Sequence, residues 1–259
     1  MTAPLLLAAD IGNSHTVLGL VSDGDVAADW RVATTETRTA DEWSVLIRGL
    51  LGDRTDDVQG IVVCATVPGV LREWRTMLAG HFADLACVVV EPGVRTGVPV
   101  LTDNPREVGT DRIVNALAAV TTYGAPAIVV DFGATATTFD VVDEQGRYIG
   151  GAISPGIQIS LEALERRGAQ LRMVELQRPR SVIARNTVEA LQSGLVFGVA
   201  SQVEGIVARM TTELGDPAAI SVIATGYLAP LVAAECRCFT DHDPWLTLRG
   251  LEIVHRRNT

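Results

Sequence analysis

One pattern occurs twice in this chain: a strand that ends in an aspartate, then a glycine and a run of small or hydroxyl residues. The first copy, "PLLLAADIGNSHTVLGL", contains Asp10, and the second, "AIVVDFGATATTFDVV", contains Asp131. Each copy continues into further strand-like segments, which is typical of an antiparallel hairpin. The copies lie much farther apart than the ~20–50 residues of a solenoid repeat, so they indicate duplicated domains.

Apolar runs alternate with amphipathic stretches through the rest of the chain, which predicts a mixed α/β fold. Thr39 and Glu42 have the spacing of a capping box, and Asp23-Gly24 is a hairpin turn signal. A short linker at 122–127 divides the chain into two α/β lobes, 1–122 and 123–259. The expected strands are 4–9, 15–22, 25–32, 60–67, 86–92, 127–131, 136–143, 147–153 and 219–225. The expected helices are 39–51, 68–82, 105–122, 155–170, 187–213 and one from Leu228.

Composition narrows the function classes. Acidic residues exceed basic ones by 31 to 21, giving a net charge of −10, which disfavours nucleic acid as a partner. The short basic clusters at 178–180 and 255–258 are interpreted as solvated faces. No apolar run reaches the ~20 residues of a membrane span, and the first apolar run reads as a strand, not a signal peptide.

The four cysteines indicate no disulfide framework. Cys64 and Cys87 lie in apolar runs, where a small buried side chain is expected. Cys236 and Cys238 form C-x-C, which is neither a C-x-x-C redox motif nor half of a zinc site. A reducing cytoplasm is therefore the expected compartment. The four histidines have no metal-ligand spacing.

The two hairpin loops are candidates for phosphate binding. A single Asp-x-Gly would be explained by a turn, but two copies with hydroxyl side chains favour a functional reading. Glycine and hydroxyl groups admit an anion closely, and an adjacent carboxylate can hold a hydrated Mg²⁺. The polar residues are Asn13, Ser14 and Thr16 in the first loop, and Thr135, Thr137 and Thr138 in the second; all but Asn13 carry a hydroxyl.

Two further segments complete the candidate site. Thr225 and Gly226 end a buried strand before a helix, a corner suited to the far end of a nucleotide. Gly109–Arg112 begins the amphipathic part of a helix. There Asp111 and Arg112 are either a surface ion pair, or a proton acceptor and an anion-steering group for phosphoryl transfer.

These residues resemble the type III pantothenate kinases, of the acetate kinase, sugar kinase, Hsp70 and actin superfamily. The similarity spans nearly the whole chain, through "DIGNSHT", "EPGVRTG", "DNPREVGTDRIVNALAA", "VVDFGATATTFD", "GGAISPGIQIS", "NTVEALQSG" and "ATG". It implies ATP-dependent phosphorylation of pantothenate to 4′-phosphopantothenate, the first step of coenzyme A biosynthesis. It also implies two ribonuclease-H-like lobes with a nucleotide cleft between them, and a homodimer.

The resemblance also implies roles for individual residues. Asp111 would be the proton acceptor, Asp10 would lie near Mg²⁺, and Asp131 would hold a monovalent cation, K⁺ or NH₄⁺. Pantothenate would be bound by Gly109, Thr110, Asp111, Arg112 and Thr187. ATP would be bound by Asp10, Ile11, Gly12, Asn13, Ser14, His15, Thr16, Val17, Gly133, Ala134, Thr135, Thr225 and Gly226.

The chain departs from the family pattern at four places. Thr102 stands where a tyrosine is common, Thr110 replaces an alanine, and Tyr227 follows "ATG" in place of glycine. The second hairpin has an additional residue, Ala134 in the simplest alignment, and the Asp-to-turn-glycine spacing agrees, 15 positions against 14 in the first. We expect Gly133 and Ala134 to form a bulge, with Thr135 in the phosphate-binding position and ATP binding weakened.

Two alternatives remain open on the sequence alone. One is a kinase or phosphatase of the same superfamily acting on another small hydroxyl compound, against which the Gly109–Arg112 block argues. The other is a catalytically weak regulatory protein. The net charge and the absence of a basic helix-turn-helix argue against DNA contact.

Overall fold

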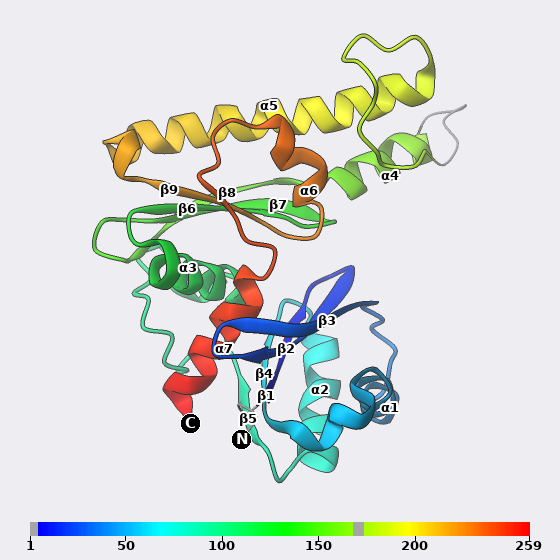
Figure 1. The fold of residues 1–259 in the computed structure, drawn as a ribbon, viewed down its shortest axis with the longest axis vertical. Coiled ribbons are helices and arrows are strands. Elements are labelled where there is room, and N and C mark those ends of the chain that lie inside the picture. The colour runs from blue at the N-terminus through cyan, green and yellow to red at the C-terminus, as the bar shows by residue number, and fades with distance from the viewer. Residues whose placement is uncertain (1–4, 168–173) are drawn as a thin grey trace. The chain divides into compact units, whose positions relative to one another are not determined.

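The computed structural model describes residues 5–167 and 174–259 and divides into two compact units. The first unit contains the described residues up to Val98, with Asp103–Ala118 and Trp245–Thr259. The second contains Pro99–Thr102 and the described part of Ala119–Pro244. Figure 1 labels the elements of both units. Residues 245–259 pack with the first unit, whereas the sequence analysis assigned them to the second lobe.

The first unit is built on a five-stranded sheet of order β3-β2-β1-β4-β5. Strands β1, β2 and β3 are an antiparallel meander, and β4 and β5 add to it in parallel. The predicted turn at Asp23-Gly24 is confirmed, with both residues at positive φ. The strands are β1 Leu5–Ile11, β2 His15–Ser22, β3 Asp25–Ala33, β4 Val58–Ala65 and β5 Ala86–Val89.

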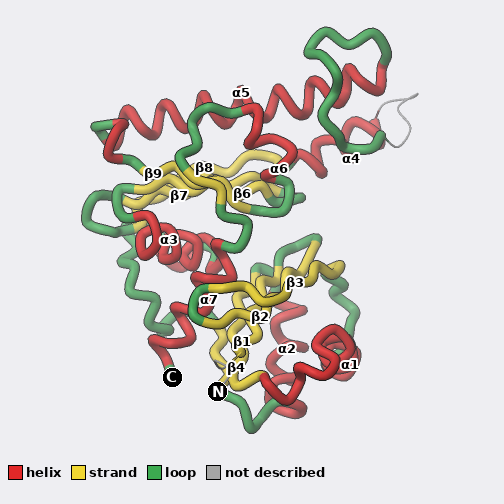
Figure 2. Tube along the Cα trace, in the orientation of Figure 1, coloured by secondary structure: helices red, strands yellow, loops and turns green. Residues whose placement is uncertain are grey.

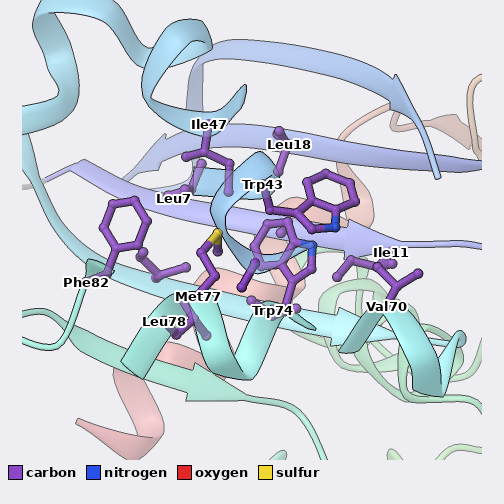
Figure 3. Close-up of a cluster of buried hydrophobic side chains, with 14 of the residues drawn as sticks. Leu7, Ile11, Leu18, Trp43, Ile47, Val70, Trp74, Met77, Leu78 and Phe82 are labelled. Atoms are coloured by element: carbon purple, nitrogen blue, oxygen red, sulfur yellow. The ribbon is translucent and has the colours of Figure 1, made fainter. Parts of the chain in front are cut away.

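Helices α1 (Ala40–Leu51) and α2 (Pro68–His81) cover one face of this sheet. Leu7 and Ile11 of β1 point into this core, with the rings of Trp43 and Trp74 5.3 Å apart (Figure 3). The predicted capping box is confirmed, because Thr39 and Glu42 hydrogen-bond reciprocally at the start of α1. A 3₁₀ segment, Gly52–Asp57, links α1 to β4.

Helix α7 (Leu246–Asn258) packs on β1, β2 and β4. Two glycines of the sheet allow close approach: a Cβ on Gly19 would collide with Leu248, and one on Gly60 with His255. On its other side α7 meets α3 (Thr110–Tyr123), where a Cβ on Gly250 would lie 2.7 Å from Val114 Cγ1. This face of the sheet, opposite α1 and α2, carries Asp10.

The second unit repeats this plan. Its sheet has the order β10-β9-β6-β7-β8, which is the first order read backwards, with β6 in the place of β1. Figure 2 shows β6, β7, β8 and β9 of this sheet as strands, with helix α5 along one side. The meander and the added parallel strand are the same, so the predicted duplication is confirmed at the level of topology. The strands are β6 Ala127–Phe132, β7 Ala136–Val142, β8 Tyr148–Pro155, β9 Ser221–Thr225 and β10 Asp241–His242.

Helices α4 (Ile157–Arg167), α5 (Thr187–Leu214) and α6 (Ala229–Val232) cover one face of the second sheet. Ile128, Val130 and Phe132 of β6 point into this core, so Asp131 lies on the opposite face. By length and composition α5 could cross a membrane. Its buried side chains, however, form the core of this unit, which accounts for its apolar character.

Two details differ from the sequence-based prediction, and a third lies partly outside the described residues. The helix expected over 105–122 is a 3₁₀ turn, Pro105–Glu107, and then α3, which starts only at Thr110. Helix α7 was missed, although Leu248, Leu251 and Val254 have helical spacing and are buried. Residues 168–170 of the helix expected at 155–170 lie outside the described residues.

The cluster at 255–258 is not simply a solvated face. His255 contacts the carbonyl of Ala86, 3.0 Å away, and Arg257 donates to the carbonyl of Thr96. Asn258 bonds both the N–H and the carbonyl of Arg95 at 3.0 Å. The end of α7 therefore fixes the "VRTG" part of the motif at 94–97. Short 3₁₀ segments at Pro217–Ala219 and Ala233–Glu235 complete the elements.

Candidate functional site

The first half of the candidate site lies at the end of β1. Asp10 is the second-last residue of that strand, and the loop Gly12–His15 joins it to β2. Gly12 donates to the carbonyl of His15, and a Cβ on Gly12 would lie 3.1 Å from that oxygen, so glycine keeps the loop tight. Asn13 and Ser14 are exposed at its tip. Burial, and then the charge of Arg31, lower the pKa of His15, so its imidazole is neutral at pH 7.

Asp10 has a protein donor on the neighbouring strand. Asp10 pairs with Cys64 across the parallel β1–β4 ladder, which puts both side chains on the same face. The Cys64 thiol donates a hydrogen bond to Oδ1 of Asp10 at 3.2 Å. Cys64 is fully buried. This thiol therefore orients one carboxylate oxygen of Asp10.

The first turn of α3 supplies the second carboxylate. In this turn the backbone N–H of Ile113 donates to the carbonyl of Gly109, so Gly109–Arg112 forms the start of the helix. A Cβ on Gly109 would collide with Oδ1 of Asp111, which explains the glycine. Burial raises the pKa of Asp111, while hydrogen bonding and the charge of Arg112 act against that rise. Among the described residues, Oδ1 of Asp111 and Oγ1 of Thr110 are buried with no hydrogen-bond partner.

Asp10 and Asp111 converge on the same place. Burial raises the pKa of the Cys64 thiol well above its usual range, and the negative charges of Asp10 and then Asp111 raise it further. Two carboxylates from segments a hundred residues apart in sequence therefore act on one thiol. Convergence of this kind, with one carboxyl pKa raised by burial, is typical of catalytic sites. Asp111 is half-buried as a residue, its Oδ1 is buried, and the charge of Arg112 acts on it, so an ion pair with Arg112 is compatible with a role as proton acceptor.

The second half of the candidate site lies at the equivalent place in the second unit. Asp131 pairs with Thr138 of β7 and with Thr225 of β9, so all three side chains lie on the face opposite α5. Thr225 is buried, and in the repeat it takes the place that Cys64 has beside Asp10. The sheet thus presents a carboxylate with a hydroxyl on each side.

Gly226 packs directly against Asp131. Its φ is +90°, and a Cβ there would collide with Oδ1 of Asp131 and lie 2.7 Å from the Phe132 nitrogen. Only glycine fits this corner without displacing the carboxylate. The helix after it, α6, is four residues long, so the corner consists mainly of the strand end and Gly226.

The bulge expected at Gly133 and Ala134 does not occur. The pairing of β6 with β7 runs unbroken from Ala127 to Phe132, and the loop Gly133–Ala136 is as long as the loop Gly12–His15. A Cβ on Gly133 would lie 2.8 Å from the carbonyl of Ala136, the same contact that Gly12 makes. Relative to the first hairpin, the additional residue lies in the longer turn between β7 and β8.

The two loops also accept equivalent backbone hydrogen bonds. The carbonyl of Ser14 accepts from Thr34, and the carbonyl of Thr135 accepts from Gly156, at 3.0 and 2.9 Å. Thr135 thus corresponds to Ser14. The carbonyl of Ala134 accepts a second bond, from Ile159 in the first turn of α4. Ala134 is buried, so it is an integral part of the loop.

Three of the predicted hydroxyl residues lie elsewhere. Thr16 and Thr137 are buried on the core faces of their sheets, and the Thr16 hydroxyl is bonded to that of Thr34 at 2.9 Å. Thr187 is exposed at the first position of α5, capped by Asn186. Because α5 covers the other face of the second sheet, Thr187 is not brought to Asp131.

The donor sets fit the cations that the sequence analysis expected. Among the described residues no group of three or more His, Cys, Asp or Glu side chains could enclose a metal ion. Mg²⁺ usually needs no such cage, because it is held by one or two carboxylates, several waters and the substrate phosphates. Asp10 at the strand end suits that role. Asp131, between two hydroxyls and the Gly226 corner, suits a weakly held monovalent cation.

Sequence reasoning missed Cys64 as part of the site. Its apolar surroundings predicted a buried core residue, and nothing in the local sequence shows that its ladder partner is Asp10. Cys87, expected to be buried as well, is exposed. The chain contains no lysine, so every permanently cationic side chain that could meet a phosphate is an arginine.

Comparison with known proteins gives a consistent result. A family model described as type III pantothenate kinase matches residues 6–209. A protein of that name from a Nocardioides species is 75% identical over 254 residues, covering 98% of this chain and 99% of its own. One from Streptomyces coelicolor is 56% identical, covering 98% of both chains.

Solved structures show the same fold in more distant proteins. A candidate 2-dehydro-3-deoxygalactonokinase from Sinorhizobium meliloti superposes with a TM-score of 0.59 at 16% identity, covering 97% of this chain and 96% of its own. At that identity the similarity concerns the fold alone.

Proposed function

This chain belongs to the type III pantothenate kinase family, and we propose that the residues described above carry out its reaction. The activity is ATP-dependent phosphorylation of pantothenate to 4′-phosphopantothenate, the first step of coenzyme A biosynthesis. Its two α/β units have the fold of the acetate kinase, sugar kinase, Hsp70 and actin superfamily.

The observation that carries the mechanism is the half-buried Asp111, whose Oδ1 is buried and whose charge acts on the same thiol, Cys64, as that of Asp10. A pKa raised by burial makes Asp111 a stronger proton acceptor than an ordinary aspartate. Asp111 takes the proton of the pantothenate hydroxyl as the hydroxyl oxygen attacks the γ-phosphorus of ATP, whose bond to the bridging oxygen breaks so that ADP leaves. Its unpartnered Oδ1 and the nearby Thr110 hydroxyl are free to bind the substrate. Arg112 attracts the pantothenate carboxylate.

Asp10 holds Mg²⁺, whose chemistry here is to neutralise charge on the phosphates. Cys64 orients one oxygen of Asp10 and would in this way position the carboxylate that would hold the ion. The loop 12–15 lies at the same strand end and receives phosphate through its backbone, with Asn13 and Ser14 at its tip. Thr16 contributes by shaping this loop, since its hydroxyl is bonded to Thr34.

In the second unit, Asp131 holds the monovalent cation, K⁺ or NH₄⁺, and the loop 133–136 binds phosphate. Thr225 and Gly226 bind the nucleoside end of ATP. The proposal rests on the repeat, because Asp131 and its loop have the same pairing, the same tight glycine and the same anchored carbonyl as Asp10 and its loop.

We also propose that the protein is a homodimer. Several large apolar side chains of the second unit are exposed on α4 and around the start of α5: Ile159, Leu164, Val182, Ile183 and Val188. A second copy of the chain would cover such a surface and place Thr187, which lies beside Val188, next to the partner. Light scattering at micromolar concentration tests this, and a monomer would contradict it. We also propose a cytoplasmic location, because the chain belongs to a family of metabolic enzymes.

The experiment that tests the function is direct. Purified protein with ATP, Mg²⁺, K⁺ and pantothenate should form phosphopantothenate, detected by mass. Phosphorylation of a different hydroxyl compound in preference to pantothenate would overturn the substrate. Absence of any phosphoryl transfer by a folded, ATP-binding protein would favour a regulatory role.

A further inference from the structure

The C-x-C pair lies at the end of the segment that follows α6. The 3₁₀ segment Ala233–Glu235 ends at Cys236, and the chain bends at Arg237 before Cys238. Both cysteines are half-buried and pack on the core of the second unit. A side-chain hydrogen bond joins the two thiols. Residues two apart point to the same face even in a straight strand, so the two side chains leave the chain on one side, with the bend at Arg237 between them.

The bend is held from several directions. The backbone N–H of Arg237 donates to Oε1 of Glu204 on α5 at 2.8 Å. The sulfur of Cys236 lies 3.5 Å from the carbonyl of Val232 and 3.8 Å from that of Ala200. Glu235 is paired with Arg178. These contacts hold in place the segment that carries both thiols, and a disulfide between them requires Cα atoms within about 7 Å of each other.

The two thiols are chemically unequal. The hydrogen bond from Cys236 lowers the pKa of Cys238, because it stabilises the thiolate there. The same bond, with burial and the charges of Glu204 and Glu235, raises the pKa of Cys236. Cys238 is therefore the better nucleophile of the pair, and Cys236 is the thiol that keeps its proton.

We propose that Cys236 and Cys238 form a redox-active dithiol that closes to an intrachain disulfide by exchange with a small-molecule disulfide. The Cys238 thiolate attacks one sulfur of the oxidant, forming a mixed disulfide and releasing one thiolate. Cys236 then gives up its proton to that thiolate or to solvent and attacks the Cys238 sulfur, which releases the second thiol. Two protein thiols are oxidised and one small-molecule disulfide is reduced to two thiols.

The other two cysteines lack this arrangement. Cys64 is fully buried and bonded to Asp10, and Cys87 is exposed in β5. Although the residue is exposed, partial desolvation of its sulfur raises the pKa of Cys87, which makes it slower to react than Cys238. Cys87 is therefore the matched internal control for a thiol without a resolving partner.

The test uses the full-length protein and oxidised glutathione. Trypsin cleaves after Arg237, so it separates the two cysteines into peptides 210–237 and 238–249. After oxidation, these peptides should be recovered joined to each other, and a reductant should separate them. In Cys236→Ser the exchange should stop at a glutathione adduct on Cys238. In Cys87→Ser the joined peptides should form as in the wild type.

Rates give the second readout. In the reduced protein at neutral pH, an alkylating reagent should modify Cys238 at least about tenfold faster than Cys87, because more of Cys238 is thiolate. Cys236→Ala should slow Cys238 by removing its hydrogen-bond donor. Circular dichroism confirms that each variant is folded. Stable glutathione adducts on both Cys236 and Cys238 of the wild type, or equal alkylation of Cys238 and Cys87, would overturn the proposal.

Discussion

The thiol of Cys64 donates a hydrogen bond to Oδ1 of Asp10 across two neighbouring parallel strands. Because groups that orient a metal-binding carboxylate affect metal affinity, Cys64→Ala should raise the Mg²⁺ concentration for half-maximal rate by about tenfold. Cys64→Ser keeps a donor and should restore most of the affinity. Magnesium titrations of the rate measure this, with Cys87→Ser as the control. Equal Mg²⁺ dependence in the Ala and Ser variants would show that the hydrogen bond has no such role.

Asp111→Asn should reduce turnover by ~10²–10⁴-fold, the usual contribution of a positioned general base. Steady-state rates with pantothenate and ATP measure the effect, and nucleotide binding should persist. A variant that keeps near-normal turnover would exclude Asp111 as the base.

The same substitution should stabilise the fold at neutral pH. Since burial raises the pKa of Asp111 in the folded protein, the unfolded chain loses this proton first as pH rises above about 4. The wild type therefore loses stability relative to Asp111→Asn between the unfolded and folded pKa values, and the deficit remains at higher pH. Below both values the two proteins should be equally stable. Tm values measured across this range test the sign, and a less stable variant at pH 7 would contradict it.

Asp131→Ala should remove the dependence of the rate on the monovalent cation. The wild type should work faster in K⁺ or NH₄⁺ than in Na⁺, whereas the variant should be slow and alike in all three. Rates at constant ionic strength measure this. Equal wild-type rates in the three salts would exclude Asp131 as the site of an activating monovalent cation.

Gly226→Ala should lower the activity more than the strain of a positive φ at an alanine explains. Gly215→Ala is the matched control, because Gly215 also has a positive φ, +115°, but open space around its Cβ position. Both should lose ~1–2 kcal/mol of stability from the left-handed backbone. Only Gly226→Ala should also lose cation dependence, since its Cβ would displace Asp131. If the two variants behave alike, the contact with Asp131 is not functional.

Deleting Ala134 should destabilise the second unit and weaken nucleotide binding. The deletion shortens a loop that matches its counterpart in length, and it removes the carbonyl that accepts from Ile159. Unfolding curves and ATP titrations measure the two effects. A deletion variant that binds ATP more tightly would restore the interpretation of Ala134 as a surplus residue.

The elements that sequence predicted well are those with local signals. The capping box at Thr39, the turn at Asp23-Gly24 and the two hairpins follow from residues a few positions apart. The repeat of Asp10 and Asp131 was visible because the same local pattern recurs. The turn between β7 and β8 was not assigned correctly, because the spacing from Asp131 to Gly146 cannot tell which of two turns is longer.

Contacts between residues far apart in the sequence were harder to predict. Cys64 meets Asp10 only through the register of two strands, and Gly226 meets Asp131 in the same way. The inward direction of Thr16 and Thr137 depends on which face of each sheet receives the helices. A single sequence carries no direct signal for such pairings.

Helix α7 has a consequence for how the chain is made. Its contacts with β1, β2 and β4 cover the face of the first sheet that carries Asp10, yet α7 is translated after the whole second unit. Although N-terminal domains generally fold first during synthesis, the first unit of a nascent chain can cover this face only when Trp245–Thr259 have left the ribosome. Until then its apolar surface is available to chaperones, while the second unit can already form its core.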